Sequence, residues 1–190
     1  MIVSGLNKIL VIANSRSGSK NTMVSLHKVT GIRYRAEPWN YTHDWKDRDY
    51  SISEDKIIIK TLADQIPEGF EFNEFYDELI PKFDLVILLS RKNKNEVYES
   101  FNYFARNNID WHTEWEKPED MVISDEVMNV VDNQYYCLNE IHNRYGIPFT
   151  WYEDLYSGDY ETFKEVTKDW GLNIDELYEN FNPKNRLRKT

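Results

Sequence analysis

A short polar segment that carries two cations and one glycine follows an apolar run close to the N-terminus. The apolar run covers residues 8–13 and predicts a strand that is buried on both faces, as in a parallel sheet covered by helices. Gly18 permits a tight turn after this strand, and the free N–H groups at the start of a helix attract anions. The segment therefore predicts a phosphate-binding loop, whose members are Arg16, Ser17, Gly18, Ser19, Lys20 and Asn21.

This loop departs from the G-x-x-x-x-G-K-[ST] pattern of nucleoside triphosphatases. Ala13 stands where the first glycine of that pattern belongs, and Ser19 instead of lysine follows Gly18. The cations of the loop, Arg16 and Lys20, supply positive charge at other positions. Taken alone, the loop also fits an ordinary strand-turn-helix with two solvated cations.

A second group of cations follows the apolar run 84–90, which predicts another buried strand. Arg91 and Lys92 come directly after this run, and the predicted helix over residues 95–107 carries Ser100. Open parallel sheets bind ligands at the carboxyl ends of their strands. Nucleoside triphosphatases place an Asp at such a strand end to hold Mg²⁺, whereas cations suit a phosphate and repel a metal. The pattern predicts an anion site without a metal, with a solvated basic turn as the alternative.

The other apolar periodicities place helices between strands. Strands are predicted over residues 8–13, 32–36, 56–62, 84–90 and 147–152. Helices are predicted over residues 19–29, 72–79, 95–107 and 124–144, and helical pieces over 160–170 and 175–181. Strands that alternate with helices predict an α/β fold with three layers and a doubly wound, mainly parallel sheet. The 190 residues, of which 41% are hydrophobic, fit one domain over residues 1–190.

Charge and composition argue against several classes of partner. The formal net charge of −10 disfavours nucleic acids, so a neutral or cationic small-molecule acceptor is expected. The single cysteine, Cys137, rules out an intrachain disulfide and a cysteine-based zinc cluster. The sequence lacks both the roughly 18 consecutive apolar residues of a membrane span and the pattern of a signal peptide. A cytoplasmic protein without a membrane partner is the expectation.

Taken in order, these motifs resemble those of the sulfotransferases that use 3′-phosphoadenosine 5′-phosphosulfate (PAPS). In that family a Lys or Arg precedes Ser-Gly-[Ser/Thr] in the loop that holds the 5′-phosphosulfate, which implies this role for residues 16–21. A strand-end Arg and a Ser on the next helix hold the 3′-phosphate, which implies Arg91 and Ser100. The family usually spaces these two residues by eight, whereas Arg91 lies nine and Lys92 eight residues before Ser100. Either cation is therefore a candidate for the 3′-phosphate.

The resemblance extends to the predicted strand 56–62, which is similar to the strand that carries Lys-Thr-His in many sulfotransferases. It implies that Lys60 contacts the sulfuryl group, but Leu62 replaces the histidine base. In the bacterial trehalose-sulfotransferase branch, a Glu-Pro-Phe segment after the second strand carries a glutamate base. Glu37 lies in a similar Glu-Pro-Trp segment. The implied catalytic residues are Glu37, Lys60 and Arg16, and partial burial is expected to raise the pKa of Glu37 towards neutrality.

The resemblance thus implies a P-loop type of fold and transfer of a sulfuryl group from PAPS to the hydroxyl of a small acceptor, such as a glycan, without a metal. Residues 40–55 and 107–122 are predicted loops that border the acceptor site. The basic tail, residues 186–189, is similar to the segment that closes over the 3′-phosphate in several family members. Two alternatives stay open: a small nucleotide kinase of P-loop type, and a non-catalytic nucleotide-binding protein of the same fold.

Overall fold

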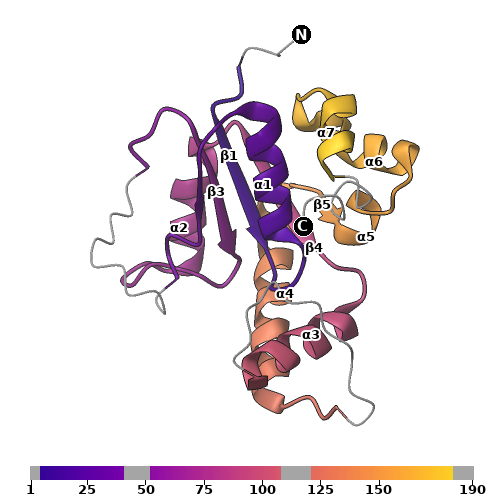
Figure 1. The fold of residues 1–190 in the computed structure, drawn as a ribbon. Helices are drawn as coiled ribbons and strands as arrows, with labels where there is room; N and C mark the ends of the chain where they lie inside the picture. The colour runs from indigo at the N-terminus through magenta and orange to yellow at the C-terminus, as the bar shows by residue number, and fades with distance from the viewer. Residues whose placement is uncertain (1–4, 41–51, 108–120, 182–190) are drawn as a thin grey trace.

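The computed structural model describes residues 5–40, 52–107 and 121–181 of the chain (Figure 1). At its centre lies a sheet of five strands in the order β2-β3-β1-β4-β5. The strands are β1 (Lys8–Ala13), β2 (Tyr34–Ala36), β3 (Ile57–Leu62), β4 (Leu85–Ser90) and β5 (Phe149–Trp151). All four pairings between neighbouring strands are parallel, which confirms the predicted α/β class.

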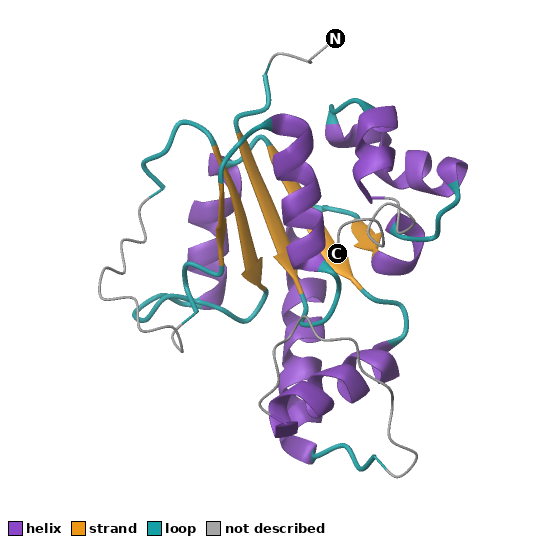
Figure 2. Ribbon diagram, in the orientation of Figure 1, coloured by secondary structure: helices purple, strands orange, loops and turns teal. Residues whose placement is uncertain are grey.

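Helices cover both faces of this sheet (Figure 2). They are α1 (Ser19–Thr30), α2 (Phe72–Leu79), α3 (Lys94–Asn107), α4 (Asp125–Tyr145), α5 (Tyr152–Leu155), α6 (Tyr160–Thr167) and α7 (Ile174–Phe181). Two 3₁₀ turns, η1 (Ile80–Lys82) and η2 (Lys168–Trp170), follow α2 and α6. The expected layered arrangement, with helices on either side of a parallel sheet, is therefore confirmed.

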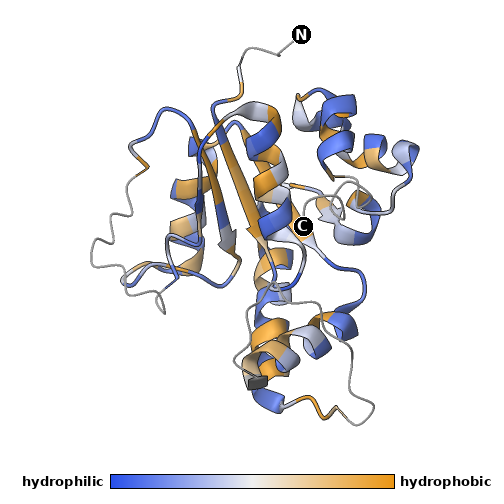
Figure 3. Cartoon of the chain, in the orientation of Figure 1, coloured by the Kyte–Doolittle hydropathy of each residue, from blue (hydrophilic) through white to orange (hydrophobic). Residues whose placement is uncertain are grey.

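Alternate side chains of β1 point into two separate cores. Ile9 and Val11 pack on the face covered by α1, α6 and α7, whereas Leu10 and Ile12 pack on the face covered by α2 and α4. All four side chains are fully buried, as expected of the central strand of a sheet covered on both sides. Figure 3 shows the same pattern, with hydrophobic strands in the interior and hydrophilic residues on the outer sides of the helices. This burial fixes where the carboxyl end of β1 emerges.

The long helix α4 is closed at both ends by its own sequence. Ser124 Oγ accepts a hydrogen bond from the Val127 N–H over 3.4 Å at the first turn. At the other end Gly146 adopts the left-handed conformation with φ 68°, and its N–H donates to the carbonyl oxygen of His142. In the described residues no helix, α4 included, combines the length and the apolar character that a membrane crossing requires.

Two strands, β2 and β5, differ from their predicted bounds by more than one residue at an end. β2 begins at Tyr34 rather than at residue 32 and forms an edge of the sheet, where its three residues are only partly buried or exposed. β5 ends at Trp151, because the chain turns there into α5, a single helical turn that no apolar period indicates. α2 ends at Leu79 as predicted, and Pro81 lies in η1, which follows it.

The connections leave the two central strands β1 and β4 in opposite directions. The chain passes from β1 through α1 to β2 on one side, and from β4 through α3 and α4 to β5 on the other. Neighbouring strands with diverging connections leave a crevice at their carboxyl ends, where open α/β sheets bind ligands. Arg16 and Arg91 stand in the segments that follow β1 and β4. The fold therefore brings both predicted anion-binding segments to the same edge of the sheet.

Gly18→Ala is predicted to destabilise the protein more than Gly31→Ala, although both glycines flank α1 with a positive φ, 77° and 70°. At Gly31 an added Cβ meets open space, so only the left-handed backbone is unfavourable, by about 1–2 kcal/mol. At Gly18 the Cβ would lie 2.7 Å from two ring atoms of Tyr152, which adds about 1–3 kcal/mol. Urea unfolding of both variants measures the difference, and equal losses would contradict the packing of Tyr152 on Gly18.

Candidate functional site

The loop after β1 is held by hydrogen bonds to buried partners. Ser17 Oγ donates to the carbonyl oxygen of Asn14 over 2.7 Å, and the N–H of Ser15 donates to Gln134 Oε1 of α4 over 2.7 Å. Arg16 and Gly18 both have a positive φ, 60° and 77°. This conformation is uncommon for a residue with a side chain, and such residues concentrate at ligand-binding and active sites.

The remaining residues of the predicted loop form the first turn of α1. Ser19 is buried, whereas the side chains of Lys20 and Asn21 are exposed. Tyr152 of α5 and Tyr156, which directly follows α5, pack against this turn. The Tyr152 ring lies on Gly18, and Tyr156 Oη is 2.9 Å from Thr22 Oγ1. The start of α1 is therefore in direct contact with the segment that follows β5.

Arg16 contacts α3. Its Nε donates to Ser100 Oγ over 2.7 Å, and its guanidinium lies 4.1 Å from the centroid of the Phe104 ring. Ser100 and Phe104 are four residues apart and so lie on the same face of α3. Both are buried, with 5% and 1% of their surface exposed. The predicted 5′-loop residue Arg16 and the predicted 3′-phosphate residue Ser100 are thus direct neighbours.

Arg91, directly after β4, belongs to the same neighbourhood. Its guanidinium lies 4.3 Å from the centroid of the Tyr152 ring, and its Nη2 is 3.5 Å from Glu96 Oε2. Its Nε is buried and has no hydrogen-bond partner among the residues that the structure describes. Burial lowers the pKa of Arg16, and the charge of Arg91 lowers it further, against a smaller opposing effect of Tyr152. Two guanidinium groups therefore repel one another here, and an anion bound between them would relieve that repulsion.

Lys92 makes its contacts elsewhere. Its Nζ lies 2.5 Å from Asp154 Oδ1, and its backbone N–H donates to Glu153 Oε2 over 3.0 Å. Half of its side chain is exposed. Of the two strand-end cations that the sequence leaves open, Arg91 is the one that shares the surroundings of Arg16 and Ser100.

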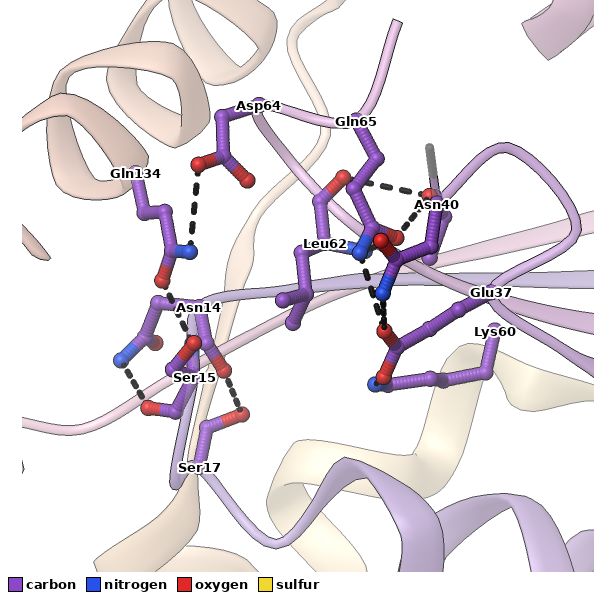
Figure 4. A network of polar contacts seen from close by, with 11 residues as sticks. Asn14, Ser15, Ser17, Glu37, Asn40, Lys60, Leu62, Asp64, Gln65 and Gln134 are labelled. Atoms are coloured by element: carbon purple, nitrogen blue, oxygen red, sulfur yellow. Dashed lines mark hydrogen bonds and ion pairs between the residues drawn. The ribbon is translucent and has the colours of Figure 1, made fainter. Parts of the chain in front are cut away.

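Glu37, which is partly buried, and the buried Lys60 form an ion pair near the carboxyl ends of β2 and β3 (Figure 4). Glu37 directly follows β2 with a φ of 50°, and its N–H donates to the carbonyl oxygen of Lys60 over 2.6 Å. Its Oε1 accepts from Lys60 Nζ, and its Oε2 accepts from Asn40 Nδ2 and Gln65 Nε2 over 2.9 Å each. Lys60 exposes only 7% of its side chain.

The expectation that burial leaves Glu37 with a raised pKa is wrong. Burial alone would raise the pKa of this carboxyl, but the charge of Lys60 and the hydrogen bonds from Lys60, Gln65 and Asn40 lower it to about 2. Burial also lowers the pKa of Lys60, an effect that Glu37 opposes and the nearby charge of Lys20 strengthens. A carboxylate with so low a pKa is a weak base at neutral pH. In this arrangement the carboxylate of Glu37 is held against Lys60, and its role as a base stays a prediction.

The sequence motifs do not single out a second carboxylate, Asp64, two residues beyond the end of β3. Gln134 Nε2 donates to its Oδ2 over 3.2 Å, whereas Oδ1 is buried without a partner among the described residues. Burial raises the pKa of Asp64, and the charge of Glu37 adds to this, against opposing effects of Gln134 and Lys60. The only signal in the sequence is an acidic residue soon after a predicted strand.

Several predicted site segments lie outside the described residues. They are the basic tail 186–189, residues 41–51 of the loop 40–55 and residues 108–120 of the loop 107–122. In the three described stretches, no group of three or more His, Cys, Asp and Glu side chains could hold a metal ion. The absence of a metal from the reaction stays a prediction.

No protein-family model matches this chain, and no curated protein matches it at a significant level. The class that the structure defines is an α/β protein with a five-stranded parallel sheet. Its candidate site contains two neighbouring arginines, Arg16 and Arg91. It also contains two carboxylates whose pKa values shift in opposite directions, Glu37 downward and Asp64 upward.

Glu37→Gln is predicted to destabilise the protein by about 3 kcal/mol, because Lys60 would stay buried without its counter-charge. Glu165→Gln is the control, since it removes the carboxylate of an exposed ion pair with Lys168, and such pairs contribute little. Urea unfolding at pH 7 compares the two variants. A loss in Glu37→Gln no larger than in Glu165→Gln would show that the Glu37–Lys60 pair is not a buried structural contact.

The same pair predicts a pH dependence of stability. The pKa of Glu37 is about 2 in the folded chain and near 4.5 when unperturbed, so its contribution is present above pH 4.5 and is lost as the pH falls towards 2. The stability difference between wild type and Glu37→Gln should therefore shrink over this interval. Urea unfolding at pH 6, 4 and 3 measures it, and a difference that stays constant would place the Glu37 pKa at its ordinary value.

Proposed function

We propose that this protein is a PAPS-dependent sulfotransferase that moves a sulfuryl group to the hydroxyl of a small acceptor, such as a glycan. The observation that carries the proposal is the meeting of Arg16, Arg91 and Ser100 beyond the carboxyl ends of β1 and β4. The proposal includes a P-loop type of sheet. Its support is the all-parallel sheet with a tight, serine-rich loop between its central strand and α1.

The three residues suit a 3′-phosphate. Guanidinium groups bind phosphate oxygens through paired, charge-assisted hydrogen bonds, and a serine hydroxyl can add another. Arg91 Nε, which is buried without a partner in the described part of the chain, is a donor that such an oxygen could meet. The rings of Phe104 and Tyr152 lie against the two guanidinium groups, and the contact with Glu96 offsets part of the charge of Arg91. A doubly charged phosphate that binds here would meet both guanidinium groups.

Lys60 and the first turn of α1 suit the other end of the same molecule. PAPS supplies the sulfuryl group, and its 5′-phosphate is the leaving group. Lys60 stands on β3 opposite Val11 of β1, and Glu37 fixes its ammonium group. Fixed cations and helix N–H groups stabilise the negative charge that develops on the bridging oxygen during such a transfer. Lys60 is therefore assigned an electrostatic role.

A small nucleotide kinase is the second candidate, and Asp64 is the observation that favours it. A carboxylate close to the end of a core strand can hold the Mg²⁺ of a nucleoside triphosphate. The loop after β1 argues against this candidate, because Ser19 stands where a kinase would have lysine. A non-catalytic nucleotide-binding protein would bind the same ligands and show no turnover.

Calorimetric titration with 3′-phosphoadenosine 5′-phosphate (PAP) in EDTA, compared with ATP in Mg²⁺, tests the proposal. We expect PAP to bind without a metal and at least tenfold more tightly than ATP with Mg²⁺, because a second charge-assisted phosphate contact is worth about 1.5–3 kcal/mol. A preference for ATP with Mg²⁺ would contradict a sulfotransferase and favour the kinase. Release of PAP from PAPS then distinguishes an enzyme from a non-catalytic protein.

Arg91→Gln is predicted to weaken PAP binding about 10- to 100-fold, because it removes a charged donor to the 3′-phosphate. Binding of adenosine 5′-phosphate, which lacks the 3′-phosphate, should change much less. Lys92→Gln is the matched control, since it makes the same change of charge one residue along the chain. Equal losses of PAP affinity in both variants would show only a general effect of charge. A loss confined to Lys92→Gln would assign the 3′-phosphate contact to Lys92 instead of Arg91.

A further inference from the structure

Two carboxylates stand close to the carboxyl end of β3, and their surroundings differ in kind (Figure 4). Every hydrogen bond described for the carboxylate of Glu37 comes from a side chain: Lys60 on Oε1, and Asn40 and Gln65 on Oε2. Each carboxylate oxygen can accept about two hydrogen bonds. The three donors on Glu37 therefore leave it less acceptor capacity than a carboxylate with an oxygen that meets no donor.

Asp64 has such an oxygen. Its Oδ2 accepts from Gln134 Nε2, whereas its Oδ1 is shielded from solvent and meets no donor among the described residues. A buried carboxylate oxygen without a donor is costly, and such an oxygen can serve a bound water, a ligand or a reaction. Asp64 thus keeps one acceptor position unfilled, two residues beyond the carboxyl end of β3.

Gln134 fixes which oxygen of Asp64 stays open. Its Oε1 accepts from the N–H of Ser15 over 2.7 Å, so its Nε2 is the end that faces and donates to Asp64 Oδ2. Gln134 is itself 2% exposed, which holds the amide in this orientation. One buried side chain thus ties Asp64 to the loop that begins at the end of β1.

We propose that Asp64, rather than Glu37, accepts the proton of the acceptor hydroxyl, and that Glu37 acts as a positioning residue for Lys60. The inference rests on the proposed function and names the base of that reaction. The acceptor oxygen forms a bond to sulfur while the bond from sulfur to the 5′-phosphate oxygen breaks. The electron pair of the broken bond stays on that phosphate oxygen, and the hydroxyl proton passes to Asp64 Oδ1. The products are the sulfate ester and PAP.

The electrostatic surroundings agree with these roles. Burial raises the pKa of Asp64, while the Lys60 ion pair and its companion hydrogen bonds bring that of Glu37 down to about 2. Two carboxylates whose pKa values are pushed apart are the usual mark of separate roles in acid–base chemistry. The groups that face Asp64 are Gln134 and Cys137 of α4, Tyr76 of α2, Lys60 of β3 and Glu37 after β2.

Asp64→Asn is the decisive variant, and Asp55→Asn, a change to an exposed aspartate before the same strand, is its control. The PAP dissociation constant, PAPS turnover and the pH dependence of kcat are measured for both, with small sugars and polyols as acceptors and with water as the acceptor in PAPS hydrolysis. Asp64→Asn should lose at least about 100-fold in kcat, as expected for loss of a general base, and bind PAP within about twofold of wild type. The rise of kcat with pH should disappear in Asp64→Asn and persist in Glu37→Gln and Asp55→Asn.

The possible results distinguish a wrong assignment of Asp64 from a wrong proposal of sulfotransferase function. Absence of PAP binding and of PAPS turnover by the wild type would overturn both. Normal PAP binding with wild-type kcat and pH profile in Asp64→Asn would overturn the assignment of Asp64 and leave the sulfotransferase intact. Should Asp64→Asn fail to fold, carbon-13 NMR titration of the wild-type carboxyl groups decides: Asp64 must titrate above the ordinary aspartate range, and a value below that range overturns the proposal.

Discussion

The burial of residues 9–13 of β1 is the constraint on which the rest of the structure depends. Its side chains fill two cores at once, so the strand can neither shift nor rotate without exposing apolar surface. β3 and β4 pair with it on either side in parallel register, which brings the carboxyl ends of all three strands to one edge of the sheet. The positions of Arg16, Lys60 and Arg91 follow from that pairing.

The charges at this edge divide into two groups. Arg16 and Arg91 lie against aromatic rings, Arg16 donates a hydrogen bond to Ser100, and Arg91 also lies 3.5 Å from Glu96. Lys60 instead has a dedicated partner in Glu37. One group suits the recognition of a phosphate, and the other suits a reaction in which a cation must be held in one place. The proposed sulfuryl transfer uses both, the first to bind and the second to stabilise developing charge.

The sequence predicts the backbone of this site better than the directions of its side chains. Apolar runs locate β1, β3 and β4 to within a residue, because strands buried on both faces carry an uninterrupted apolar signal. The approach of Arg16 to Arg91 follows from strand order, but the contact of Lys92 with Asp154 depends on α5, a four-residue helix stabilised by tertiary packing.

The pKa of Glu37 is another property that cannot be predicted from the sequence alone. Its value depends on Lys60, which lies 23 residues away in the chain, and spacing alone does not reveal the pair. Asp64 is equally hidden, because its open oxygen and its tie to Gln134 depend on the packing of α4 against the end of β3. Residue types and strand ends can thus be predicted from the sequence, whereas the division of roles between two carboxylates requires the folded arrangement.

The most direct test of the account is a crystal structure of the protein with PAP. The account predicts that the 3′-phosphate lies between the guanidinium groups of Arg16 and Arg91, within hydrogen-bond distance of Ser100 Oγ, and that Arg91 Nε gains an acceptor. The 5′-phosphate should lie at the first turn of α1, on the side of Lys60. A nucleotide bound elsewhere, or one whose 3′-phosphate contacts Lys92 and leaves the arginine pair unchanged, would contradict the central claim.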